Sequence, residues 1–228
     1  MLIASSRHSS VDLETWAMHE RTDAVNAEST RLDQKVVEAA RAIRYFVDAG
    51  GPAYCGVSWG KDSVVVAHLV TAVVRVSLPL VWVRVRGKEN PDCPAVRDAF
   101  LSSHGAMYEE IEVDAPGRGL TSSIGFAEAR LRHGVRHVSG VRAQESRERM
   151  LRSRRHGTST EATCAPLTWW TSDDVFAYLY REALPVHPAY ACSQGGLWER
   201  GRIRVGALGG ERGRGHGRHE WEQRYYGT

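Results

Sequence analysis

The residues best suited to chemistry lie in one short loop, SWGKDS (58–63), which interrupts two apolar runs. The run before the loop is typical of a buried strand, and the run after it is typical of a helix. Gly60 lets backbone amides approach an anion, and the amides at a helix N-terminus carry partial positive charge. Ser58 and Ser63 add hydroxyl donors, and Lys61 adds a full charge. These features predict a phosphate-binding loop without Walker A spacing; the alternative is an ordinary capped turn with a surface lysine.

Arginine is concentrated in two further segments, although the formal net charge of the chain is only +3. The guanidinium group presents a planar fork of donors, so each segment suits an anionic ligand. The alternative is a solvated charged face. The first segment holds Arg142, Arg147, Arg149, Arg152, Arg154 and Arg155, and the second holds Arg200, Arg202, Arg204, Arg212, Arg214 and Arg218.

Strand patterns alternate with helix patterns along the chain, which predicts a parallel sheet covered by helices on both faces. In such a sheet, ligands bind at the carboxyl ends of the strands, and the loop lies at such an end. We expect an N-terminal arm or short helix over 1–30, a nucleotide-binding α/β domain over 31–192 and a Gly/Arg-rich tail over 193–228. The predicted strands are 53–58, 78–85, 107–113 and 135–141, and the predicted helices are 32–47, 62–74, 125–134, 146–155 and those starting near Pro94 and Thr171.

The four cysteines are far apart in the sequence and form no CxxC pair, so neither a zinc ribbon nor a thioredoxin-like motif is predicted. No apolar run approaches the ~20 residues of a membrane helix. The first residues are too polar for a secretory signal. We therefore expect a cytoplasmic protein with reduced thiols and no membrane partner.

Four stretches together resemble a known family. VSWGKDSVVVAHL (57–69) resembles the PP-loop of the ATP pyrophosphatase superfamily, and within it the phosphoadenosine phosphosulfate (PAPS) reductase family. Three later stretches resemble further motifs of that family in the same order: HVSGVRAQESRERM (137–150), CAPLTWWTSDDVFAYL (164–179) and LPVHPAY (184–190).

The resemblance implies an α/β fold with a five-stranded, Rossmann-like sheet of the adenine-nucleotide α-hydrolase type. It also implies an enzyme that uses ATP and Mg²⁺. It assigns catalysis to Lys61, Asp62 and Arg142. Asp62 and Glu145 become candidate metal ligands, whereas Glu145 could instead orient Arg142 or be a local helix-start carboxylate. The implied nucleotide-binding residues are Ser58, Trp59, Gly60, Lys61, Asp62, Ser63, Arg142 and Glu145.

The sequence also departs from the family. No cysteine follows Cys192, where the sulfite-releasing reductases carry a catalytic one, and 202–210 lacks the thiols of an iron–sulfur cluster. We therefore expect no such cluster. Cys93 is a candidate sulfur carrier, with a buried structural thiol as the alternative. Arg84 and Arg86 stand where relatives place an aspartate near the nucleotide, which suggests added phosphate contacts.

The leading hypothesis is an ATP pyrophosphatase of the PAPS reductase-like type that adenylates a substrate for sulfur incorporation. The resemblance extends to enzymes of DNA phosphorothioation, which would make DNA and a cysteine desulfurase or another sulfur-transfer protein its partners. The arginine-rich segments suit DNA. One alternative is a PAPS or adenylyl-sulfate reductase. Another is a non-catalytic nucleotide-binding module of a larger complex.

Overall fold

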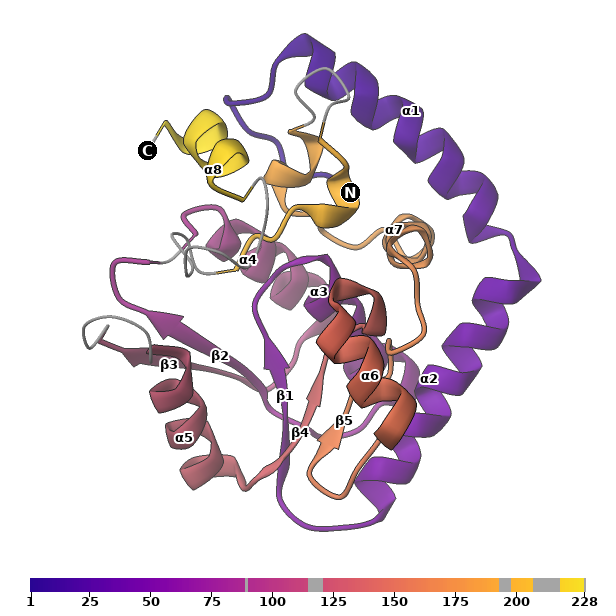
Figure 1. Ribbon diagram of the computed structural model, residues 1–228, viewed down its shortest axis with the longest axis vertical. Helices are drawn as coiled ribbons and strands as arrows, with labels where there is room; N and C mark the ends of the chain where they lie inside the picture. Colours follow the sequence, from indigo (N-terminus) through magenta and orange to yellow (C-terminus); the bar gives the residue numbers. More distant parts are fainter. Residues whose placement is uncertain (89, 115–120, 193–197, 207–217, 228) are drawn as a thin grey trace.

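Five parallel strands form the centre of the molecule (Figure 1). A computed structural model of the chain describes residues 1–88, 90–114, 121–192, 198–206 and 218–227. The strands lie in the order β3-β2-β1-β4-β5, and every neighbouring pair is parallel. The predicted α/β fold class is therefore confirmed. The strands are β1 Ala53–Val57, β2 Leu80–Val85, β3 Tyr108–Val113, β4 Arg136–Ser139 and β5 Thr163–Cys164.

Helices surround this sheet, as the alternating pattern predicts (Figure 1). Helix α3 continues directly into a π-helical segment, Leu69–Val74, so the predicted single helix over 62–74 has two parts. The helices are α1 Ser10–Ala27, α2 Thr30–Asp48, α3 Lys61–His68, α4 Cys93–His104, α5 Thr121–His133, α6 Arg147–His156, α7 Ser172–Arg181 and α8 Arg218–Tyr226.

Alternating side chains of the strands feed two hydrophobic clusters. Cys55 and Val57 of β1 belong to the larger cluster, which helices α3 and α7 share. Tyr54 precedes Cys55 in sequence and points to the opposite face, where it joins a small cluster with Ala129 of α5. The sheet is thus buried on both sides, as a parallel sheet requires.

The N-terminal residues form more structure than the predicted arm or short helix. Helix α1 has 18 residues and begins with a capping box between Ser9 and Asp12. Trp16 packs edge-on against Phe176 of α7, with ring centroids 6.0 Å apart. Because much of α1 is exposed, its sequence has no clear apolar stripe, and apolar periodicity therefore does not predict a helix of this length.

The described parts of the predicted Gly/Arg-rich tail also pack against the fold. Ile203 and Val205 are buried, and so are Trp221 and Tyr225 of α8. The guanidinium of Arg200 donates to Asp23 of α1 at 2.6 Å and lies 4.0 Å from the ring centroid of Phe176. Arg212 and Arg214, which were predicted to suit an anionic ligand, lie outside the described residues.

The strand order places a topological switch point between β1 and β4. From β1 the chain adds β2 and β3 on one side, and then returns to add β4 and β5 on the other. Loops that leave the carboxyl ends of β1 and β4 therefore meet, and such a crevice is where open α/β sheets bind ligands. None of the helices in the described ranges combines the length and apolar character needed to cross a membrane.

Candidate functional site

The loop after β1 turns sharply at Trp59. Its φ of 58° lies in the left-handed region, where a bulky side chain is strained. The indole is fully buried, with ring centroids 5.7 Å from Phe100 and 5.6 Å from Tyr108. This packing holds the strained turn in place. The Trp59 side chain therefore faces the core, which leaves only the backbone of Trp59 for the predicted contact with nucleotide.

The two loop serines have different surroundings. The buried Ser63 hydroxyl accepts a hydrogen bond from the Ser58 amide at 3.2 Å and donates one to the Gly60 carbonyl at 3.0 Å. Ser63 thus braces the loop, and its hydroxyl proton is not directed outward to a phosphate as predicted. Ser58 is exposed and remains a candidate donor. Gly60 precedes α3 and offers no side-chain cap, which leaves the first-turn amides other than that of Lys61 suited to an anion.

Two buried cations flank one carboxylate at the start of α3. Lys61 Nζ lies 2.9 Å from Asp62 Oδ2, and Arg142 Nε lies 2.6 Å from Asp62 Oδ1. Burial alone would raise the pKa of Asp62, but the charges of Lys61 and Arg142 outweigh it and hold this pKa below its ordinary value. The structure therefore brings together all three predicted catalytic residues. Two cations for one carboxylate leave a net positive charge, which suits a phosphate.

Tyr190 and Val205 complete the loop, and the sequence analysis did not assign either to the site. The Lys61 amide donates to the Tyr190 hydroxyl at 3.1 Å, and the Lys61 ammonium lies 5.3 Å from the Tyr190 ring centroid. A methyl group at Gly60 would lie 3.2 Å from both Tyr190 Oη and Val205 Cγ2. Tyr190 ends the LPVHPAY motif, so the signal was present. Val205 lies in a Gly/Arg-rich stretch that contains no motif to indicate a site residue.

Gly140, which follows β4, allows the loop bearing Arg142 to reach α3. A Cβ at this position would lie 2.8 Å from the carbonyl carbon and oxygen of Asp62, and 3.0 Å from the Ser63 amide nitrogen. These are backbone atoms, which cannot move aside without displacing the start of α3. Glycine is therefore required sterically where the two loops meet.

Glu145 holds the backbone beside Arg142. It accepts a hydrogen bond from the Arg142 amide at 2.9 Å, and the Arg149 guanidinium donates to the same carboxylate oxygen. It therefore fixes the position of Arg142 through the main chain and not through the guanidinium.

Both predicted magnesium ligands are already paired with cations. The oxygens of Asp62 already contact Lys61 and Arg142, and Glu145 is paired with Arg149. In the portion of the chain that is described, no three His, Cys, Asp or Glu side chains are grouped as a metal site would need. The described residues thus do not fit a magnesium site held by the protein.

Comparison with known proteins gives one family match. The model of the phosphoadenosine phosphosulfate reductase domain matches residues 128–199, which include three of the four motifs but not the loop after β1. Residues 128–199 are thus similar to the PAPS reductase domain. No curated protein sequence matches it.

Two solved structures share the fold of this chain. One is a PAPS reductase from Candida auris in a phosphate complex, with a TM-score of 0.50, 13% identity and coverage of 70% of this chain and 89% of the other. The second is an FMN adenylyltransferase from Candida glabrata in complex with ATP, with a TM-score of 0.50, 12% identity and coverage of 76% and 66%. At identities this low, the structural similarity establishes the fold alone.

None of the four thiols in the described structure is accessible. All four cysteines are buried: Cys55, Cys93, Cys164 and Cys192. Cys93 Sγ donates to the carbonyls of Ser58 at 3.5 Å and Val205 at 3.4 Å. Burial raises the pKa of the Cys93 thiol to about 12, and nearby Asp92 adds to the effect. Because a sulfur carrier needs an accessible thiolate, these observations favour the alternative, in which Cys93 is a buried structural thiol.

Two other expectations change. Arg84 donates to Glu110 of β3 at 2.8 Å, and Arg86 pairs with Glu112 and Asp114, so carboxylates already neutralise these arginines instead of phosphates. His187, in the LPVHPAY motif, is buried.

Proposed function

We propose that this PAPS reductase-like chain is an ATP pyrophosphatase that adenylates an oxygen nucleophile. The observation that carries the proposal is the convergence of Lys61, Asp62 and Arg142 at the start of α3, where Gly60 supplies no side-chain cap. This arrangement combines backbone amides with two cations at the switch point of a parallel sheet. Both features favour a polyphosphate, and the ATP complex of the adenylyltransferase neighbour is consistent with a nucleotide at this fold.

In the proposed reaction, an acceptor oxygen attacks the α-phosphorus of ATP. A bond forms between that oxygen and the α-phosphorus, and the bond from the α-phosphorus to the bridging oxygen of the β-phosphate breaks. Pyrophosphate leaves, and the acceptor is adenylated; with water as the acceptor the products are AMP and pyrophosphate. Lys61 and Arg142 would neutralise negative charge that develops on the phosphates. Asp62 would hold both cations in position.

The buried thiols favour ATP-driven activation over sulfonucleotide reduction. A reductase that releases sulfite needs a reactive thiol, and every cysteine of this chain is buried with a raised pKa. In a sulfur-incorporation pathway, sulfur would therefore come from a partner such as a cysteine desulfurase. DNA phosphorothioation is the specific setting that we propose, with an oxygen of the DNA backbone as the acceptor.

The test is incubation with ATP labelled at the α-phosphate, with and without DNA, followed by separation of AMP, ADP and adenylated products. We expect AMP formation that is lost in Lys61→Met and kept in Lys35→Met, because Lys35 pairs with Asp174 and not with Asp62. ADP as the product would overturn the proposal. Absence of any ATP turnover would favour the non-catalytic module, and sulfite release from PAPS would favour the reductase.

A further inference from the structure

Helix α6 is an exposed basic element beside the candidate site. It carries five arginines and one glutamate over Arg147–His156, and none of its residues is buried. It follows the short 3-10 helix Ala143–Glu145, which itself follows Arg142. The helix thus begins a few residues from a side chain that contacts Asp62.

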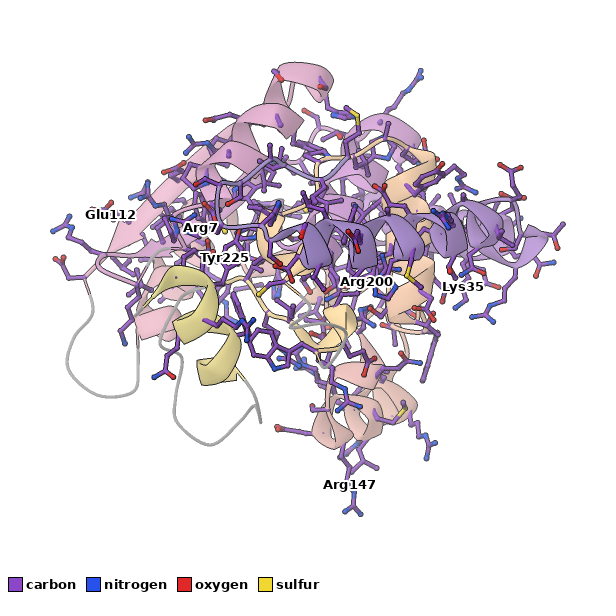
Figure 2. The ribbon with its side chains drawn as sticks, turned by 90° about the horizontal axis from the view of Figure 1, so that it is seen from above. Arg7, Lys35, Glu112, Arg147, Arg200 and Tyr225 are labelled. Atoms are coloured by element: carbon purple, nitrogen blue, oxygen red, sulfur yellow. The ribbon has the colours of Figure 1, made fainter. Side chains whose placement is uncertain are left out.

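The arginines of α6 are divided between two faces. Arg149 turns inward to the carboxylate of Glu145. Arg147 points away from the body of the protein (Figure 2). The exposed arginines of the helix are Arg147, Arg152, Arg154 and Arg155.

These four exposed arginines have no acidic partner among the described residues. Elsewhere in the fold, arginines commonly bond to carboxylates, as Arg97 does with Glu110 and Arg200 with Asp23. Glu148 is the single acidic residue of α6. The outward face of this helix therefore carries positive charge that the described part of the protein leaves uncompensated.

We propose that the outward face of α6 binds the phosphodiester backbone of a nucleic acid. Arginine presents fork-shaped donors that match phosphate oxygens, and a row of uncompensated cations attracts a polyanion over distance. At 1.5 Å per residue, Arg147 to Arg155 spans about 12 Å of helix. This length corresponds to three to four phosphates of one strand at about 3.4 Å each along a duplex.

The position of α6 also suits a substrate path. A strand held on this helix extends toward the loop that carries Arg142, where the acceptor oxygen would meet ATP. This path rests on the proposed function, whereas binding to α6 does not. Binding is therefore measured without ATP, so that the two proposals can fail separately.

The experiment is fluorescence anisotropy with labelled single-stranded DNA, duplex DNA and RNA of one sequence, titrated with the full chain at several salt concentrations. The test variant is Arg147→Ala/Arg154→Ala. The matched control is Arg21→Ala/Arg41→Ala, which removes one exposed arginine from α1 and one from α2. The control and the test variant therefore have the same net charge. Alanine favours helix, so α6 should persist, and circular dichroism checks this.

We expect the test variant to bind about tenfold more weakly at low salt. The slope of log affinity against log salt concentration should become less steep by roughly one unit for each arginine removed. The control should bind like the natural chain. Equal losses in both variants, or no salt-dependent binding by the natural chain, would overturn the proposal. Equally effective competition by polyglutamate would also overturn it, in favour of an acidic protein partner. If the natural chain binds nucleic acid through α6 but does not turn over ATP, only the proposed function is contradicted.

Discussion

Arg142 Nε lies 2.6 Å from Asp62 Oδ1, which joins the loop after β4 to the helix after β1. The two residues are 80 positions apart in the chain. Arg142 is almost fully buried, so this contact is shielded from water and salt. A guanidinium held in this way is oriented before any phosphate arrives, and this lowers the cost of binding one.

Replacement of Arg142 by Gln should reduce both activity and stability. AMP formation should fall by about 100-fold, as is typical when a preorganised charge donor is lost. The free energy of unfolding should fall by about 3 kcal/mol because Asp62 loses a buried partner, although Lys61 remains. Steady-state kinetics and urea unfolding measure the two effects. Arg132→Gln, which breaks an exposed ion pair with Glu109, is the control and should be nearly neutral. Unchanged kinetics in Arg142→Gln would remove Arg142 from the mechanism.

Gly140→Ala should destabilise the protein by about 1–3 kcal/mol, because the added methyl group overlaps the main chain of Asp62. Gly206→Ala is the matched control, since no described atom lies within 4 Å of its Cβ position. Urea denaturation compares the two variants. If both lose the same stability, the close approach of the β4 loop to α3 is not the reason for glycine at 140.

Much of the site could be predicted from local sequence, because each motif carries its own pattern. The loop 58–63 and the segment with Arg142 both follow strand patterns, and parallel strands bring such loops to one edge. The contact between them depends on the strand order, in which β1 and β4 are neighbours. Strand order is a tertiary property that periodicity alone does not encode.

The errors have similar physical causes. Trp59 follows a strand in a loop, and nothing local indicates that its ring turns back to pack between Phe100 and Tyr108. Arg84 and Arg86 were expected to contact phosphates, but the register of β2 and β3 places them beside Glu110 and Glu112. Partners such as these are set by pairing between strands distant in sequence.

The buried His187 should make stability depend on pH. Burial lowers the pKa of His187 to about 3, and its Nδ1 accepts from the Ala189 amide while Nε2 faces Asn90 Oδ1 at 2.9 Å. In the unfolded chain, His187 takes up a proton near pH 6.5. The contribution of the neutral, buried His187 to stability is therefore complete above pH 6.5 and is lost as the pH falls toward 3. The expected slope is about 1.4 kcal/mol per pH unit.

Urea unfolding between pH 7 and pH 4 measures this slope. His68 adds to it over part of the range, because burial lowers the pKa of His68 to about 4. His187→Gln should therefore flatten the profile without removing it, even if the variant is less stable at every pH. A slope identical to that of the natural chain would show that His187 does not contribute.

The thiols should be unreactive while the protein is folded. Burial raises the pKa of Cys55, Cys93 and Cys164 to about 12, and that of Cys192 to about 11, so thiolate is scarce at neutral pH. A chromogenic disulfide reagent should label none of them quickly in the native chain, and all four in guanidinium chloride. Cys93→Ser should keep AMP formation, because a hydroxyl can donate to the same carbonyls of Ser58 and Val205. One rapidly labelled native thiol that disappears in Cys93→Ser would restore Cys93 as a sulfur carrier.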